Sequence, residues 1–218
     1  MDQAGALLGL RCFLKNMENE IDLLDIIPAQ YVGSSMDAVE KRIFTSQEEA
    51  DVFFAKACER LLLINEWEKH SGISSFQLID ANGIRAERKA IIRDFIRIDI
   101  PGPGTYAGMG YDWVRIEDIR LLENSEQQLL YMTVRPSCHP MDKDGTIAHF
   151  LKAEATSTFI VRKVKLEIFA EEHGRNELAN TSDGSFLDKS RNLIVGIAAK
   201  IGLSYPQWKS LVKGLLRD

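Results

Sequence analysis

The chain has 218 residues, of which 45% are hydrophobic and 27% are charged, and it carries a formal net charge of −5 at pH 7. This length fits one large domain, or one domain with a helical appendage, and the composition is sufficient for a sizeable hydrophobic core. Proteins whose main partner is nucleic acid usually have a basic footprint, so the negative net charge argues against that class.

The N-terminus predicts neither export nor membrane insertion. The chain begins without a basic segment, and its first apolar run, Ala4 to Leu10, is short and ends at Arg11. An apolar span of about 18 residues, as a transmembrane helix needs, occurs nowhere in the sequence. The three cysteines are widely spaced without a CxxC pair, which argues against a disulfide framework and a thiolate zinc site. We therefore expect a cytoplasmic protein without a membrane partner.

The first zone of the chain, residues 1–72, predicts helices. Ser46 followed by Glu49 forms a capping box, which is typical of a helix N-terminus. Apolar residues then recur at the spacing of one helix face: Phe53, Phe54, Ala57, Leu61 and Ile64. We expect this helix to continue to Gly72, and we expect an N-terminal helix and a short helix at about 36–44 to precede it.

The second zone, roughly residues 74–173, predicts antiparallel strands. The run from Phe95 to Ile100 alternates, with three isoleucines on one face and Phe, Arg and Asp on the other. Similar runs occupy residues 76–80, 113–117, 129–135 and 159–170. The last run is too long for one typical strand, so we expect a hairpin near Arg162–Lys163. Short strands at this spacing predict a small barrel or a strongly curled sheet.

The third zone predicts two C-terminal helices. The first spans Leu187 to Ile201, and the second begins with a capping box at Ser204 and Gln207. The second helix carries an apolar stripe made of Trp208, Leu211, Val212, Leu215 and Leu216. Because this stripe is too apolar for a free tail, we expect it to pack on the β core.

These zones predict an α+β fold, with an antiparallel, barrel-like or strongly curled β core flanked by N-terminal and C-terminal helices. We divide the chain into an N-terminal helical region, residues 1–72, and a β core with two C-terminal helices packed on it, residues 73–218.

The polar run from His173 to Thr181 is the first candidate site, because it gathers an imidazole, a guanidinium, two amides and a carboxylate. One interpretation is a pocket for an anion or polar ligand, formed by His173, Arg175 and Asn176. The other is a structural turn in which Arg175 pairs with a nearby carboxylate: Glu171, Glu172 or Glu177. We favour the structural role, because the chain around Arg175 is rich in carboxylates.

Three histidines near the ends of predicted strands are candidates for a metal or enzyme site: His139, His149 and His173. Glu177 or Asp112 could add a carboxylate, but no spacing matches a ligand pair such as HExxH, so we expect no metal and no cofactor. Cys138 beside His139 does not favour a nucleophile–base pair, since adjacent residues of an extended chain point opposite ways. Convergence of the histidines with Arg135 in a pocket would favour an enzyme.

A glycine-rich connection, residues 101–110, joins two predicted strands. Phosphate-binding loops open a helix instead, so this context argues against a Rossmann or Walker site. We interpret the segment as a wide loop that can rim a binding cleft. Tyr111 and Trp113 beside it offer aromatic contact surface.

The lack of a recognised catalytic spacing or cofactor fingerprint favours a non-enzymatic binding or assembly protein. Its expected partner is another protein or a second copy of the chain. Two alternatives stay open: a hydrolase-type enzyme that uses the His, Arg and Asn cluster around His173, and a carrier whose sheet and C-terminal helix enclose a small apolar ligand. A filled core with an exposed apolar patch would favour assembly, and a large empty apolar cavity would favour the carrier.

Overall fold

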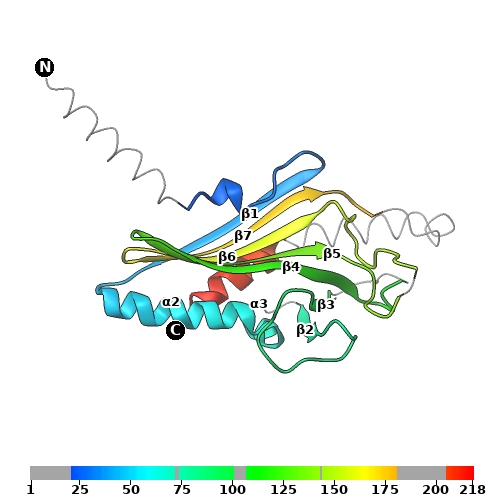
Figure 1. Ribbon diagram of the computed structural model, residues 1–218, viewed down its shortest axis with the longest axis horizontal. Coiled ribbons are helices and arrows are strands. Elements are labelled where there is room, and N and C mark those ends of the chain that lie inside the picture. Colours follow the sequence, from blue (N-terminus) through cyan, green and yellow to red (C-terminus); the bar gives the residue numbers. More distant parts are fainter. Residues whose placement is uncertain (1–20, 72–73, 101–106, 143, 181–204) are drawn as a thin grey trace, which may run out of the picture.

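The computed structural model describes residues 21–71, 74–100, 107–142, 144–180 and 205–218 (Figure 1). Its strands are β1 (Ser34–Ile43), β2 (Ser75–Ile79), β3 (Phe95–Asp99), β4 (Asp112–Glu123), β5 (Gln127–Pro136), β6 (Thr156–Val164) and β7 (Glu167–Glu177). Its helices are η1 (Leu23–Asp25), α2 (Gln47–Leu62), η2 (Ile64–Glu66) and α3 (Glu68–Ser71). Residues 205–215 form a further, C-terminal helix.

The seven strands form one antiparallel sheet in the order β1-β7-β6-β5-β4-β3-β2. β1 and β2 lie at opposite edges, so the curled sheet is not closed into a barrel. Figure 1 shows α2, α3 and the C-terminal helix on one face of the sheet, which we call the inner face; the other is the outer face. The predicted α+β class with a strongly curled antiparallel sheet is confirmed, in its open form.

The hydrophobic core lies between the inner face and the helices. α2 contributes five buried residues: Ala50, Phe53, Phe54, Ala57 and Leu61. Alternate strand residues meet them from the sheet, such as Ile96 and Ile98 of β3. Leu211, Val212 and Leu215 of the C-terminal helix belong to the same core cluster. The prediction that the apolar stripe of this helix packs on the β core is therefore confirmed.

α2 begins where the sequence predicts. Ser46 is its N-cap, and the Ser46 hydroxyl accepts a hydrogen bond from the backbone N–H of Glu49. The Glu49 carboxylate turns to Thr45, whose hydroxyl donates to it at 2.8 Å. The predicted extension to Gly72 is wrong, because α2 ends at Leu62 and is followed by η2 and α3.

The short helix predicted at about 36–44 is wrong, because these residues form the edge strand β1. β1 pairs with β7 from Ser34 to Ile43, and Ala38 is its single fully buried residue. An edge strand keeps charged side chains on both faces, so its alternation is weak. The Glu-Lys-Arg run within it also has high intrinsic helix propensity, which the pairing with β7 overrides.

The hairpin predicted near Arg162–Lys163 lies slightly further along the chain. β6 and β7 are joined at Lys165–Leu166, where Lys165 adopts a φ of 54°. β7 then continues to Glu177, so His173, Arg175 and Asn176 belong to a strand and not to a turn. Consequently, successive residues of the polar run face opposite sides of the sheet.

The N-terminal segment partly covers the outer face. Four of its apolar residues pack against Leu129, Tyr131 and Ile160 of the sheet: Ile21, Leu23, Ile26 and Ile27. The predicted N-terminal helix falls largely on residues 1–20, and the helix predicted over 187–201 is likewise outside the described residues. Within the described ranges, no helix combines the length and apolar character needed to cross a membrane.

Candidate functional site

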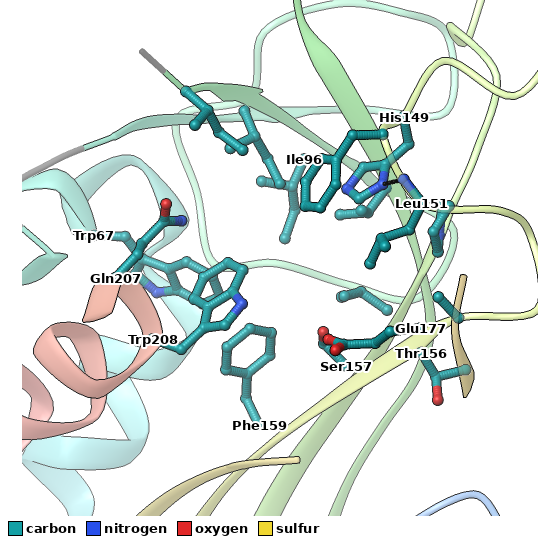
Figure 2. A pocket seen from close by; sticks show the side chains of 17 residues that line it. Trp67, Ile96, His149, Leu151, Thr156, Ser157, Phe159, Glu177, Gln207 and Trp208 are labelled. Atoms are coloured by element: carbon teal, nitrogen blue, oxygen red, sulfur yellow. Dashed lines mark hydrogen bonds between the residues drawn. The ribbon is translucent and has the colours of Figure 1, made fainter. Parts of the chain in front are cut away.

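A cavity lies between the inner face of the sheet and the first turn of the C-terminal helix (Figure 2). Its volume is about 30 Å³, which is room for about two water molecules. Most of the residues that line it are apolar and come from β3, β4, β5, β6 and the loop before β6. In its present form the cavity is therefore small, nearly filled and mainly hydrophobic.

Three aromatic rings from distant parts of the chain form one wall. Trp67 follows η2, Phe159 belongs to β6, and Trp208 belongs to the C-terminal helix. The Phe159 ring centroid lies 5.0 Å from that of Trp67 and 5.2 Å from that of Trp208, both in tilted or edge-on arrangements that aromatic pairs favour. Trp67 and Phe159 are fully buried, while Trp208 is half-buried.

A buried amide lies beside these rings. The side chain of Gln207 is 1% exposed, and its Oε1 accepts a hydrogen bond from the Ser74 hydroxyl at 2.8 Å. Within the described part of the chain, its Nε2 has no hydrogen-bond partner. Burying an amide donor without an acceptor is costly, so Nε2 marks a position for a water molecule or a ligand.

Glu177 is the carboxylate that lines the cavity. Figure 2 shows its carboxyl group directed from the sheet into the space on the side of Phe159. Asn176 adopts a φ of 58°, which interrupts the regular alternation at the end of β7. A Cβ on Gly174 would lie 2.6 Å from Oε1 of Glu177, so the missing side chain at position 174 leaves room for this carboxyl group.

A second carboxyl group, that of Glu172, is fully buried on the inner face. Glu172 lies opposite Phe159 in the β6–β7 ladder and has 0% exposure. Among the described residues, no donor has hydrogen-bond geometry to either of its carboxyl oxygens, although the Ser157 hydroxyl lies near enough to affect its pKa. Burial raises the pKa of Glu172 well above its usual range, and although the nearby Ser157 hydroxyl opposes this, the charge of Glu177 adds to it. Burial also raises the pKa of Glu177.

The polar side chains of β7 that face outward form a separate network. His173 Nδ1 lies 2.5 Å from Asp37 Oδ1, and His173 Nε2 lies 3.0 Å from Glu171 Oε2. Arg162 donates two hydrogen bonds to Glu171 at 2.7 and 3.0 Å. Burial alone would lower the pKa of His173, but the two carboxylates raise it above its usual value. The network joins β1, β7 and β6 on the outer face.

Arg175 and Asn176 hold the chain before β1. Arg175 pairs with Asp37 at 2.8 Å and donates to the carbonyl groups of Met36 and Gly174. The predicted pairing of Arg175 with Glu171, Glu172 or Glu177 is wrong, because β1 supplies the partner. Asn176 bonds to the backbone of three residues in the loop that leads to β1: Ala29, Tyr31 and Val32. Both side chains thus have partners from β1 or its preceding loop.

The remaining predicted site residues lie in three different settings. His149 lines the cavity and stacks on Phe150 with ring centroids 4.4 Å apart. His139 packs edge-on against Trp113 at 4.5 Å, and Tyr111 lies under the guanidinium of Arg97 at 4.3 Å. Arg135 pairs with Glu117 at 2.7 Å and donates to the Ala153 carbonyl.

The structure therefore does not gather the three histidines around one point. His173 faces outward, His149 faces the cavity, and His139 packs on Trp113. The described segments contain no group of three His, Cys, Asp or Glu side chains that could hold a metal ion. Of the predicted site residues, the structure brings only His149 and Glu177 to the cavity.

Sequence reasoning missed most of the residues that give the cavity its character. The sequence analysis places Glu172 and Glu177 near a turn, whereas a strand that extends to Glu177 places Glu172 on the face that carries Ile168 and Ala170. That alternation is the signal that identifies Glu172 as an inward carboxyl group. Gln207 was assigned only a capping role, and its burial depends on contacts that the sequence does not display.

No protein-family model matches the chain, and no curated protein sequence matches it. Among solved structures, it is similar to a hypothetical protein from Helicobacter pylori, with 10% identity, 84% of each chain covered and a TM-score of 0.45. It is also similar to XoxI from Bacillus cereus, with 14% identity, 84% of this chain and 96% of that chain covered, and a TM-score of 0.41. A truncated norcoclaurine synthase from Thalictrum flavum gives 10% identity, 88% and 99% coverage, and a TM-score of 0.36. Likenesses at this level carry no argument about activity.

Proposed function

We propose that the protein binds a small molecule with an apolar body in the cavity between the inner face of the sheet and the C-terminal helix. The observation that carries this proposal is the buried Gln207 amide: its side chain lines a cavity walled by aromatic rings, and its Nε2 has no acceptor among the described residues. Apolar walls with a few polar groups are the usual composition of small-molecule sites. A core that served stability alone would gain nothing from an unpaired amide.

Binding requires the cavity to widen. Sites for drug-sized ligands are typically about 300–1,000 Å³, whereas this cavity has about 30 Å³. Trp208 is the wall residue best placed to move, because it is half-buried and lies in the first turn of its helix. The other end of that helix is held by Arg60 and Arg42, which donate to the carbonyl groups of Leu215 and Leu216. In this proposal the structure is the closed conformation, and a ligand shifts the population toward an open conformation with a wider cavity.

The hydrolase alternative receives less support from the same geometry. A histidine that acts as a general base needs a free ring nitrogen near neutral pH. Both ring nitrogens of His173 face carboxylates, Asp37 and Glu171, which favour its protonated form. The arrangement therefore suits a protonated His173 that holds β1 and β7 together, and it suits a histidine that accepts a proton from a substrate less well.

The proposal is tested with 2-phenylethanol, a neutral probe with one aromatic ring. The chain has three tryptophans, and their indole N–H resonances can be followed separately by NMR. Trp67 and Trp208 line the cavity, whereas Trp113 packs in a different cluster with Ile79 and Ala148. We expect saturable shifts of the Trp67 and Trp208 signals and a nearly constant Trp113 signal.

A cavity-filling variant provides the control. Ala155 is 2% exposed and lines the cavity, so Ala155→Phe is expected to abolish the saturable shifts. Val39 is 51% exposed on the edge strand, so Val39→Phe adds the same ring elsewhere and should leave binding unchanged. Equal shifts of all three indole signals, or undiminished binding in a folded Ala155→Phe variant, would contradict the proposal.

A further inference from the structure

The cavity has an acidic wall without a matching cation. Within the described residues that line it, Glu177 is the only acidic side chain, His149 is the only other titratable one, and lysine and arginine are absent from the lining. Glu172 lies on the same strand and face, next to Ser157, which also lines the cavity. Arg175 influences both glutamates electrostatically, but its own hydrogen bonds go to Met36, Gly174 and Asp37.

The Glu177 carboxyl group is also poorly satisfied by the protein. Among the described residues, its side chain has a single hydrogen-bond partner, the Ser34 hydroxyl, at 3.4 Å from Oε2. Its other oxygen, Oε1, lies over the bare backbone of Gly174. A partly buried carboxylate normally gains stability from strong donors, and charged donors form the strongest hydrogen bonds to it. This carboxyl group is therefore available to a donor that enters the cavity.

Gln207 gives an independent sign that a polar guest belongs here. Its unpartnered Nε2 is on the helix, whereas Glu177 is on the sheet, and Figure 2 shows the aromatic side chains of Phe159 and Trp208 between them. A buried amide and a half-buried carboxyl group from different elements thus bound one apolar space. The acidic wall is not an isolated cluster of surface carboxylates.

Building on the proposed function, we infer that the natural ligand is an organic cation: an apolar, ring-containing body with a protonated amino group that pairs with the Glu177 carboxylate. The fully buried Glu172 stays protonated beside it, because two adjacent carboxylates are not readily ionised together. The rings of Trp67, Phe159 and Trp208 then cover the apolar body of the ligand. An anionic ligand of the same shape is rejected, because it would face Glu177.

The test compares three probes of nearly equal size: 2-phenylethylamine, 2-phenylethanol and phenylacetate. Dissociation constants come from the Trp67 and Trp208 indole shifts, with Trp113 as the internal reference. We expect the amine to bind about tenfold more tightly than the alcohol, because a hydrogen bond to a charged group typically increases affinity by about this factor. Phenylacetate is expected to bind more weakly than the alcohol.

Two variants assign the preference to Glu177. Glu177→Gln keeps the shape but removes the charge, so it should bring the amine and the alcohol to equal affinity. Glu154→Gln removes one charge at an exposed position and should change neither affinity. Gly174→Ala places a methyl group against Oε1 of Glu177 and displaces the carboxyl group, so it should weaken amine binding and spare alcohol binding.

The outcomes separate this inference from the proposed function. If the alcohol binds as tightly as the amine, or if the amine preference survives in Glu177→Gln, the cavity binds apolar molecules and the inferred charge selectivity is wrong. If none of the three probes moves the Trp67 and Trp208 signals, both proposals fail together. Selective amine binding that disappears in Glu177→Gln and persists in Glu154→Gln supports the inference.

Discussion

At the scale of single residues, Asn176 shows how a polar side chain can be structural. It adopts a φ of 58°, its Oδ1 accepts from the N–H groups of Tyr31 and Val32, and its Nδ2 donates to the Ala29 carbonyl. Its own N–H donates to the Gln30 side chain. Asparagine combines tolerance of the left-handed conformation with a donor and an acceptor, so few other residues could replace it here.

We therefore expect Asn176→Ala to lower the free energy of unfolding by about 2 kcal/mol, because it leaves partly buried backbone groups unpaired and strains the left-handed position. Asn176→Gly removes the same hydrogen bonds without the strain, so it should recover about 1 kcal/mol of the loss. Urea unfolding of the three proteins measures both values. An unfolding midpoint of Asn176→Ala equal to that of the parent would show that the loop before β1 is not held by this side chain.

The same residue explains a limit of sequence reasoning. The sequence favours a structural role for Arg175, and in the structure its guanidinium has partners within the protein. The partners were wrong, because they were sought among sequence neighbours. Asp37 reaches Arg175 and His173 only through the pairing of β1 with β7, and that pairing is invisible until β1 is recognised as a strand.

At the scale of elements, the segments with strong periodicity were predictable and those at the edge were not. β3 and the C-terminal helix each bury one clear face, so alternation or helical spacing identifies them. β1 has charged residues on both faces and a single buried residue, so its strand state follows from its neighbour rather than its own pattern. The cavity was unpredictable for a similar reason, since its walls come from distant segments.

Trp208 joins the C-terminal helix to aromatic residues of the sheet. The Trp208 ring contacts Phe159 and Phe76, with ring centroids 5.2 and 6.0 Å away. Trp208→Ala is expected to cost about 3 kcal/mol, the lower end of the range for removing a buried aromatic ring, because Trp208 is half-buried. Tyr205 lies in the same turn with 44% exposure, so Tyr205→Ala should change stability by less than about 0.5 kcal/mol. Thermal unfolding distinguishes the two, and equal effects would mean that the helix does not pack as described.

At the scale of the whole molecule, the two faces of the sheet hold ionisable groups whose pKa shifts act together. On the inner face, burial raises the pKa of Glu172 and of Glu177. On the outer face, burial lowers the pKa of His173, but the carboxylates of Glu171 and Asp37 outweigh this effect and raise it above its usual value. Burial would raise the pKa of Asp37 and Glu171, but hydrogen bonds to His173 and the nearby arginines bring both below their usual values.

These directions fix how stability depends on pH. A group whose pKa is raised in the folded state binds more protons when folded, so its contribution falls as pH rises through the folded pKa. Glu172 and Glu177 therefore reduce stability as the pH rises above about 4.5, and His173 reduces it as the pH rises above about 6.5. Asp37 and Glu171 have lowered pKa values, so their contribution is lost as the pH falls below about 4. We expect maximal stability on the acidic side of neutrality, near about pH 4.5 to 5.

The double variant Glu172→Gln/His173→Gln tests this assignment. Replacing the buried carboxyl group by an amide should raise the unfolding midpoint more at pH 8 than at pH 5, since an amide does not titrate and so removes the stability loss that the raised pKa of Glu172 causes. Removing the imidazolium should lower stability chiefly near pH 5, where His173 is charged in the folded protein. The fall in stability between pH 5 and pH 8 should thus be much shallower in the double variant than in the parent. Parallel stability curves for the two proteins would mean that other groups govern the pH dependence.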